Sequence, residues 1–534
     1  MEHLNKQPLS KMKPSSLSRH RGVSSALAKT GFEDCHTMES SVPRGLHCLL
    51  LLVFVLPMAG CFSPQSFPMQ VDHLVQPTSA QLSAPGGDRL DTRLWVETIH
   101  RQTAPLLPAK AREALFSNTL RDAQGRTIDI YQHFRLREAN VDALLGNLQG
   151  LEQTAQVTGP PLGGKPSPMW TGFKRVTLPS ADGWIPHARL GTPDPAYEIP
   201  GSYVIITHGM FGSLEGPDME NHVQALRRAG HHVLAIEMRG HGQVGERSRA
   251  LPITFGLRET ADLLTAAQWL KTKHHAQRVG LVAFSVYGFE SLLAAWLDAA
   301  PLGPADAARP ILRNAPAVAA EPTFNGGMFI VSAPVGIQKM SNVFAKRWGK
   351  TEAPVKWTFQ KHVENRLREF GDPPPRSIWD FIIPELRRDG WTRAYASETK
   401  LRSDMEWYLD LRTNNWSAGT QRLELARTPI LVLSAANDPL ATAQDVADLF
   451  SRVNNPNIGV ILLSGGGHMG FPALSANYYY SLMKAFFDPA TAPRRVGCPA
   501  ALPAPGISRH GRPQDDFPSI SLPTPLANDR KATS

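Results

Sequence analysis

The sequence predicts an α/β protein built on a mostly parallel sheet. The chain has 534 residues, of which 42% are hydrophobic and 19% charged, which is enough apolar material for a large core. Short and densely apolar runs alternate with amphipathic helical patterns along most of its length. Because such runs are typical of strands buried on both faces, the alternation predicts eight strands with helices on both faces of the sheet.

The expected elements follow one another in order along the chain. A first pair of strands, 173–178 and 185–190, flanks Ala181-Asp182-Gly183, which is a hairpin signal. Six more strands are expected at 202–207, 233–238, 279–284, 328–332, 430–434 and 458–464. Helices are expected at 92–116, 219–229, 256–273, 288–299 and 476–487.

The stretch 338–425 breaks this pattern. It holds several helical segments rich in Trp and Tyr and no clear strand. An insertion between strands is a suitable place for a lid over the strand ends, although its aromatic side chains would also suit a subdomain that packs on the core. The predicted parts of the chain are a signal peptide at 1–60, a flexible tether at 61–91, an N-terminal helical region with the first part of the core at 92–337, a helical lid at 338–425, the second part of the core at 426–488 and a disordered Pro-rich tail at 489–534.

The net charge of +9 lies mostly at the two ends of the chain. Residues 1–60 contribute +3 and residues 489–534 another +3, which leaves +3 for the 428 residues between them. That central part has no basic stripe interleaved with aromatics, so a nucleic-acid partner is not expected. The sequence also has no H-E-x-x-H motif, Walker loop or clustered metal ligands, so we expect neither a metal nor an organic cofactor.

The segment before residue 62 is typical of an exported protein. Eight apolar residues at 49–56 are followed by small residues and then by Cys61, as in a short secretory signal. This segment resembles a bacterial lipobox, which implies acylation of Cys61 and a lipid anchor at the cell envelope, on the outer membrane or the periplasmic face. The alternatives are a plain signal peptide cleaved near Ala59, which would give a secreted protein, and a short buried helix. Met38 would give such a signal a more ordinary start than Met1.

Polar motifs follow five of the expected strands directly. Open parallel sheets place their sites beyond the carboxyl ends of the strands, which meet at one edge. The motifs are HGMFG at 208–212, RGHG at 239–242, SVYG at 285–288, AANDP at 435–439 and GGGHMGF at 465–471. A serine, an acid and a histidine therefore occur in that order, each just past a strand end.

This order is the one found in α/β-hydrolases, and the sequence resembles that family over roughly residues 173–487. The combination of HGMFGS with GGGHMGF looks most like the predicted-esterase branch with a helical lid. The resemblance implies an α/β-hydrolase fold and a serine hydrolase that acts on a small-molecule acyl ester. Within the HG and RGHG motifs, His208 and His241 are expected to shape loops rather than to do chemistry.

The resemblance and the chemistry assign the same roles. A serine hydroxyl is a poor nucleophile until a neighbouring base takes its proton. Ser285 would be the nucleophile and His468 the general base, while Asp438 would orient the imidazole and stabilise its charged form. The oxyanion needs two preorganised donors, for which the backbone N–H groups of Met210 and Val286 are the candidates.

Two features leave alternatives open. Asp445 is a rival for the role of Asp438 further along the chain. The serine elbow reads AFSVY at 283–287 where the family has G-x-S-x-G, so Tyr287 is expected to put a large ring where helix and strand pack closest, with Gly288 giving only partial relief. A disturbed elbow would narrow the acyl pocket or favour a catalytically silent hydrolase-like binding module. An acyltransferase would use the same three side chains.

Overall fold

The computed structural model describes a central portion of the chain. The described residues are 92–136, 169–180, 187–210, 212–216, 219–241, 253–299, 301–312, 315, 318–340, 364, 368, 377–388, 391–415 and 419–489. The signal peptide, Cys61, the tether, the turn at 181–183 and nearly all of the tail lie outside these residues, so what the sequence suggests for them stays a prediction.

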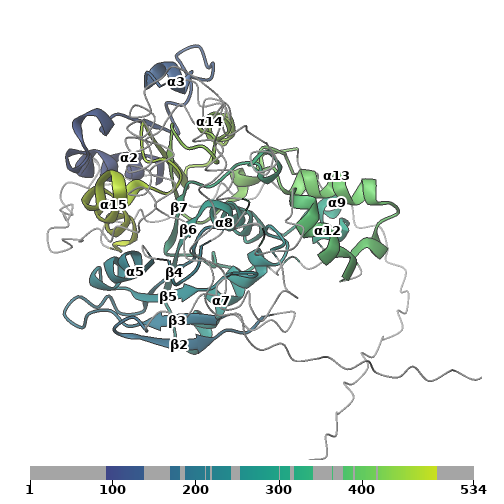
Figure 1. Cartoon of the computed structure of the whole chain (residues 1–534), viewed down its shortest axis with the longest axis horizontal. Coiled ribbons are helices and arrows are strands. Elements are labelled where there is room, and N and C mark those ends of the chain that lie inside the picture. Colours follow the sequence, from purple (N-terminus) through teal and green to yellow (C-terminus); the bar gives the residue numbers. More distant parts are fainter. Residues whose placement is uncertain are drawn as a thin grey trace, which may run out of the picture. The chain divides into compact units, whose positions relative to one another are not determined.

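A nine-stranded sheet confirms the expected α/β fold (Figure 1). Its strand order is β1-β9-β8-β7-β6-β4-β5-β3-β2, in which β5, β4, β6, β7, β8 and β9 run parallel. Antiparallel strands complete both edges, β1 beside β9, and β3 and β2 beside β5. The strands are β1 (Ala114–Phe116), β2 (Phe173–Thr177), β3 (His187–Gly191), β4 (Ser202–Ile206), β5 (His232–Ile236), β6 (Arg278–Phe284), β7 (Gly327–Val331), β8 (Ile430–Ala435) and β9 (Ile458–Leu463).

The edge strand β1 is the one that the sequence pattern misses. The pattern predicts a single helix over 92–116, whereas α2 (Thr92–Thr103) ends early and two 3₁₀ turns lead into β1. Pro105 lies in the first of these turns, and Pro108 directly precedes the second. Because proline has no N–H to donate and clashes with the preceding turn, the helix cannot continue through this segment.

Helices cover both faces of the sheet (Figure 1). One face carries α2, α5 (Met219–Arg228) and α15 (Phe471–Phe487), and the other carries α7 (Glu259–Lys273) and α8 (Ser285–Leu297). All thirteen residues of α8 are buried, since the helix packs on β6 and β7 and also contacts α7 and the 3₁₀ turn at Arg422–Leu425. None of the described helices is both long enough and apolar enough to cross a membrane.

The C-terminal part of the 338–425 insertion packs against the core. Its described helices include α12 (Ile378–Arg388) and α13 (Glu398–Tyr408). The Tyr408 hydroxyl donates to the carbonyl of Gly256 at 2.8 Å, and the Trp407 ring packs edge-on against Trp296 of α8. These two aromatic residues are therefore core. The lid expected at 338–425 stays a prediction.

Candidate active site

Three side chains from three strand ends meet at one edge of the sheet. Ser285 follows β6, Asp438 follows β8 and His468 follows β9. The Ser285 Oγ lies 2.7 Å from His468 Nε2, and His468 Nδ1 lies 3.0 Å from both carboxylate oxygens of Asp438. The structure thus brings together the three side chains that the motif order singles out.

The hydrogen bonds define which atoms carry protons. The buried Asp438 carboxylate can only accept when ionised, so His468 Nδ1 carries the proton and Nε2 is left to accept from the Ser285 hydroxyl. Asp438 Oδ1 also accepts the backbone N–H groups of Leu440 and Ala441, at 2.8 and 2.9 Å. These bonds fix the carboxylate plane, so the arrangement can move a proton from serine to imidazole without reorienting the acid.

Ser285 lies on a strained turn between strand and helix. Its φ of +54° falls in the left-handed region, which non-glycine residues rarely adopt, while Phe284 before it is extended. The backbone turns from β6 into α8 within this one residue, which places the hydroxyl at the carboxyl edge of the sheet. Backbone strain of this kind persists only where the surrounding structure enforces it, and it clusters at active sites.

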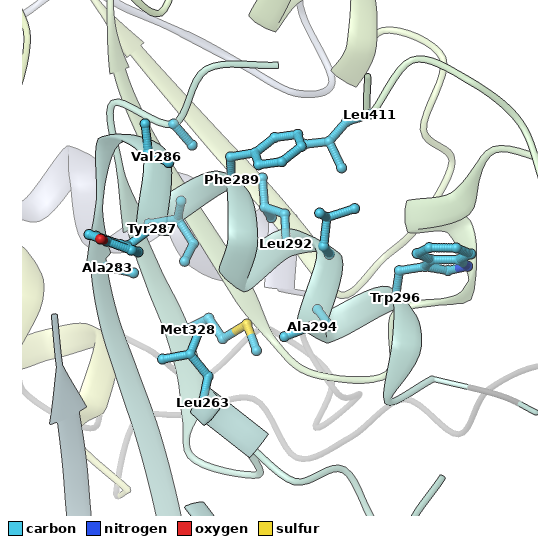
Figure 2. Close-up of a cluster of buried hydrophobic side chains, with 14 of the residues drawn as sticks. Leu263, Ala283, Val286, Tyr287, Phe289, Leu292, Ala294, Trp296, Met328 and Leu411 are labelled. Carbon is cyan, nitrogen blue, oxygen red and sulfur yellow. The ribbon is translucent and has the colours of Figure 1, made fainter. Parts of the chain in front are cut away.

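Tyr287 does not occupy the closest helix–strand contact, contrary to the expectation from the motif. That contact falls at Gly288, where an added Cβ would lie 3.0 Å from both Ala333 Cβ and Ile330 Cγ2. Figure 2 shows the Tyr287 side chain on the opposite side of the first turns of α8 from Phe289. The Tyr287 ring is fully buried, and its hydroxyl lies 2.8 Å from His241 Nδ1.

Two backbone donors lie beside the nucleophile. Val286 is in the first turn of α8, where N–H groups have no acceptor within the helix, and no side chain caps this end. On the facing loop, a Cβ on Gly209 would lie 3.0 Å from Met469 Sδ and 3.4 Å from Ser285 Cβ, so this loop lies directly beside the nucleophile. Among the described residues, the N–H of Met210 after it donates no hydrogen bond. Both donors predicted for the oxyanion therefore remain available.

Two further side chains hold the loop that carries His468. Asn437 Oδ1 accepts the N–H of Gly467 at 2.8 Å, and Ser332 Oγ accepts the N–H of Met469 at 3.0 Å. Both side chains are buried, and their hydrogen bonds hold the backbone on either side of His468. Neither residue is singled out by the sequence motifs, although Ser332 ends an expected strand and Asn437 directly precedes Asp438.

We expect Ser332→Ala to lower kcat about tenfold with little change in KM. The change removes the acceptor of the part-buried N–H of Met469, and small displacements of a catalytic group are costly. Ser434→Ala is the matched control, because Ser434 is equally buried on β8 and its Oγ has no partner among the described residues. Steady-state kinetics with a chromogenic ester measures both variants. Equal kcat values for the two would refute the assignment.

Asp445, the other candidate acid, forms ion pairs with Arg412 and Lys339 and does not contact His468. It lies on α14 (Ala443–Phe450), where Oδ1 accepts from Arg412 at 2.7 Å and from Lys339 at 2.8 Å. These ion pairs tie both ends of the insertion to α14. The carboxylate that faces His468 is that of Asp438. Within the described ranges, no group of three or more His, Cys, Asp or Glu side chains is arranged to hold a metal ion.

Comparison with known proteins gives one family. A model described as the alpha/beta hydrolase family matches residues 204–477, just over half of the chain. No curated protein matches. Similar solved structures include an esterase from Pyrococcus furiosus, 16% identical, with a TM-score of 0.39 over 61% of this chain and 97% of that one. A serine hydrolase from Xanthomonas campestris, described as having no lid, is 15% identical, with a TM-score of 0.32 over 60% of this chain and 97% of that one.

Proposed function

This chain belongs to the alpha/beta hydrolase family, and we propose that it is a serine hydrolase that cleaves carboxylic esters through an acyl-enzyme on Ser285. The single observation that carries this proposal is the continuous line of hydrogen bonds from Ser285 through His468 to Asp438. Each of the three side chains is buried and held by its own neighbours. Such preorganisation serves proton transfer better than it serves simple binding.

The reaction follows from the geometry. The Ser285 Oγ attacks the carbonyl carbon of the ester while His468 Nε2 takes the hydroxyl proton, and Asp438 stabilises the imidazolium. The N–H groups of Met210 and Val286 receive the negative charge that develops on the carbonyl oxygen. The imidazolium then protonates the leaving alkoxide. Water repeats the sequence on the acyl-enzyme, with His468 again acting first as base and then as acid.

The alternative of a silent binding module loses its main argument. That argument was a disturbed elbow at Tyr287, whereas the close contact falls at Gly288 and Ser285 keeps the left-handed backbone of a nucleophile turn. Acyl transfer to an acceptor other than water would use the same three groups. Product analysis in the presence of added alcohols separates transfer from hydrolysis.

A fluorophosphonate probe tests the proposal. Wild-type protein is expected to be labelled, and Ser285→Ala to lose both the label and all measurable hydrolysis of p-nitrophenyl esters of graded chain length. Ser481→Ala serves as the control, since this serine is fully buried on α15. Folded wild-type protein that takes no label would contradict the proposal, as would a Ser285→Ala variant that keeps it. A parallel panel of anilides and thioesters tests the ester class.

A further inference from the structure

Three buried rings pack together beneath the loop that follows β4. The rings of Tyr287 and His208 meet edge to face, with their centroids 5.3 Å apart and their planes at 88°. His241 lies 5.0 Å from His208 and 5.6 Å from Tyr287, measured between ring centroids. None of the three is more than 2% exposed. They therefore form one packed cluster, and we call it the three-ring cluster.

The hydrogen bonds of His208 fix both its tautomer and its role. The backbone N–H of Met238 donates to Nε2 at 3.1 Å, so Nε2 must accept, even though Glu237 Oε1 lies 3.4 Å from it. The proton of the neutral ring is then on Nδ1, which donates to the carbonyl oxygen of Gly209 at 2.8 Å. The N–H of Gly212 donates to the same oxygen at 2.9 Å.

That carbonyl belongs to the peptide whose other end is the N–H of Met210. Because a trans peptide is planar, its C=O and N–H point in opposite directions, and fixing the oxygen fixes the direction of the N–H. The orientation of the His208 ring thus sets where one of the two candidate oxyanion donors points. The donor's geometry matters most at the oxyanion, which exists only in the transition state.

The Tyr287 ring packs against the His208 ring and restricts its orientation. Its hydroxyl oxygen lies 2.8 Å from His241 Nδ1, which also lies 2.7 Å from the carbonyl of Arg239. A carbonyl oxygen only accepts, so Nδ1 carries the proton and shares it between the two oxygens. This contact anchors the far end of the tyrosine ring. A glycine at position 287, as in the family motif, would leave that side of His208 open.

We propose that Tyr287 is a positioning residue of the oxyanion hole, acting through His208 on the peptide between Gly209 and Met210. The inference rests on the proposed serine hydrolase function and extends it. It explains why a large ring stands where the family elbow has glycine, and it gives the two loop histidines a defined part in the site. Tyr287 itself touches no reacting atom.

The test compares substitutions that keep or remove each contact. Tyr287→Leu removes the flat ring and is expected to lower kcat at least tenfold with KM within about twofold, because the oxyanion forms only after binding. Tyr287→Phe keeps the ring and is expected to stay within about fivefold of wild type. Tyr408→Leu is the matched control, because Tyr408 is another fully buried ring whose hydroxyl bonds Gly256 instead.

A second pair of variants tests the link through His208. His208→Asn places an amide N–H where Nδ1–H was, whereas His208→Gln reaches only the Nε2 position. We expect His208→Gln to lower kcat 10- to 100-fold. The decrease in kcat expected for His208→Asn is much smaller. Thermal melts establish that each variant is folded.

Binding of a trifluoromethyl ketone separates positioning from a purely structural role. This inhibitor forms a tetrahedral oxyanion on the serine, so its affinity should fall by the same factor as kcat in Tyr287→Leu and His208→Gln. A folded Tyr287→Leu variant that binds the ketone with wild-type affinity would overturn the inference. So would a His208→Gln variant whose kcat and ketone affinity are no lower than those of His208→Asn. Wild-type protein that neither hydrolyses esters nor binds the ketone would instead overturn the proposed function.

Discussion

Replacing Asp438 by asparagine is expected to lower kcat about 10⁴-fold while the protein keeps its fold. The carboxylate accepts the Nδ1 proton of His468 and so leaves Nε2 free to accept the serine proton. An asparagine amide can donate to Nδ1, which favours the opposite tautomer and puts a proton on Nε2, and that imidazole cannot act as a base. Steady-state kinetics and fluorophosphonate labelling rates measure the loss.

Asp445→Asn is the matched control for this experiment. Asp445 is the other acid that the sequence offered, and it is also buried, but it pairs with Arg412 and Lys339. Loss of these ion pairs is expected to lower activity by less than about tenfold, because they join the insertion to α14 and do not touch the imidazole. If Asp445→Asn were the more damaging of the two, the assignment of the acid would be wrong.

The meeting of Ser285, Asp438 and His468 could be predicted because strand ends carry strong sequence signals. Each residue follows an apolar run that is buried on both faces, and parallel strands place their carboxyl ends at one edge of the sheet. The positions of the three residues therefore depend on the register of the core strands. Their catalytic role is a separate matter, on which labelling and kinetics will decide.

The sequence predicts less well those features that depend on a single contact between residues in the folded chain. The motif places the smallest residue two positions after the serine, yet the closest approach of α8 to β7 falls at Gly288, and no periodicity distinguishes these neighbours. The hydrogen bond from the N–H of Met469 to Ser332 Oγ joins residues 137 positions apart in the sequence, which only the folded chain brings together. The strand β1 is three residues long, too short for any alternation to show.

Glu290 is a buried acid that the proposed reaction does not use. It lies on α8 and is fully buried, and neither carboxylate oxygen has a hydrogen-bond partner among the described residues. Burial, followed by the negative charges of Glu259 and Asp262, raises the pKa of Glu290 well above its usual range, and Arg239 opposes this rise. The acid is therefore protonated in the folded protein well above the pH at which an exposed glutamate ionises.

This shift makes the stability of the fold fall as the pH rises. In the unfolded chain Glu290 ionises near its ordinary pKa of 4.5, whereas the folded chain keeps its proton. Between that pH and the folded pKa, each unit of pH costs about 1.4 kcal/mol of unfolding free energy. We expect Glu290→Met, which is of similar volume and cannot titrate, to remove this slope. Urea denaturation at pH 5 and pH 8 measures the expected gain, which should be larger at pH 8.

Glu259→Gln is the contrasting variant, and it should move stability in the other direction. Glu259 is equally buried on α7, but its carboxylate accepts from the N–H and hydroxyl of Thr254 and from the N–H of Gly256, at 2.6–2.9 Å. An amide there would turn one acceptor into a donor facing other donors, at a cost of about 1–3 kcal/mol. A Glu290→Met variant less stable than wild type at pH 8 would show that the carboxylate of Glu290 is ionised and satisfied in the folded chain. The two glutamates are equally buried, so the opposite signs expected for them follow from the hydrogen bonds that Glu259 accepts and Glu290 lacks among the described residues.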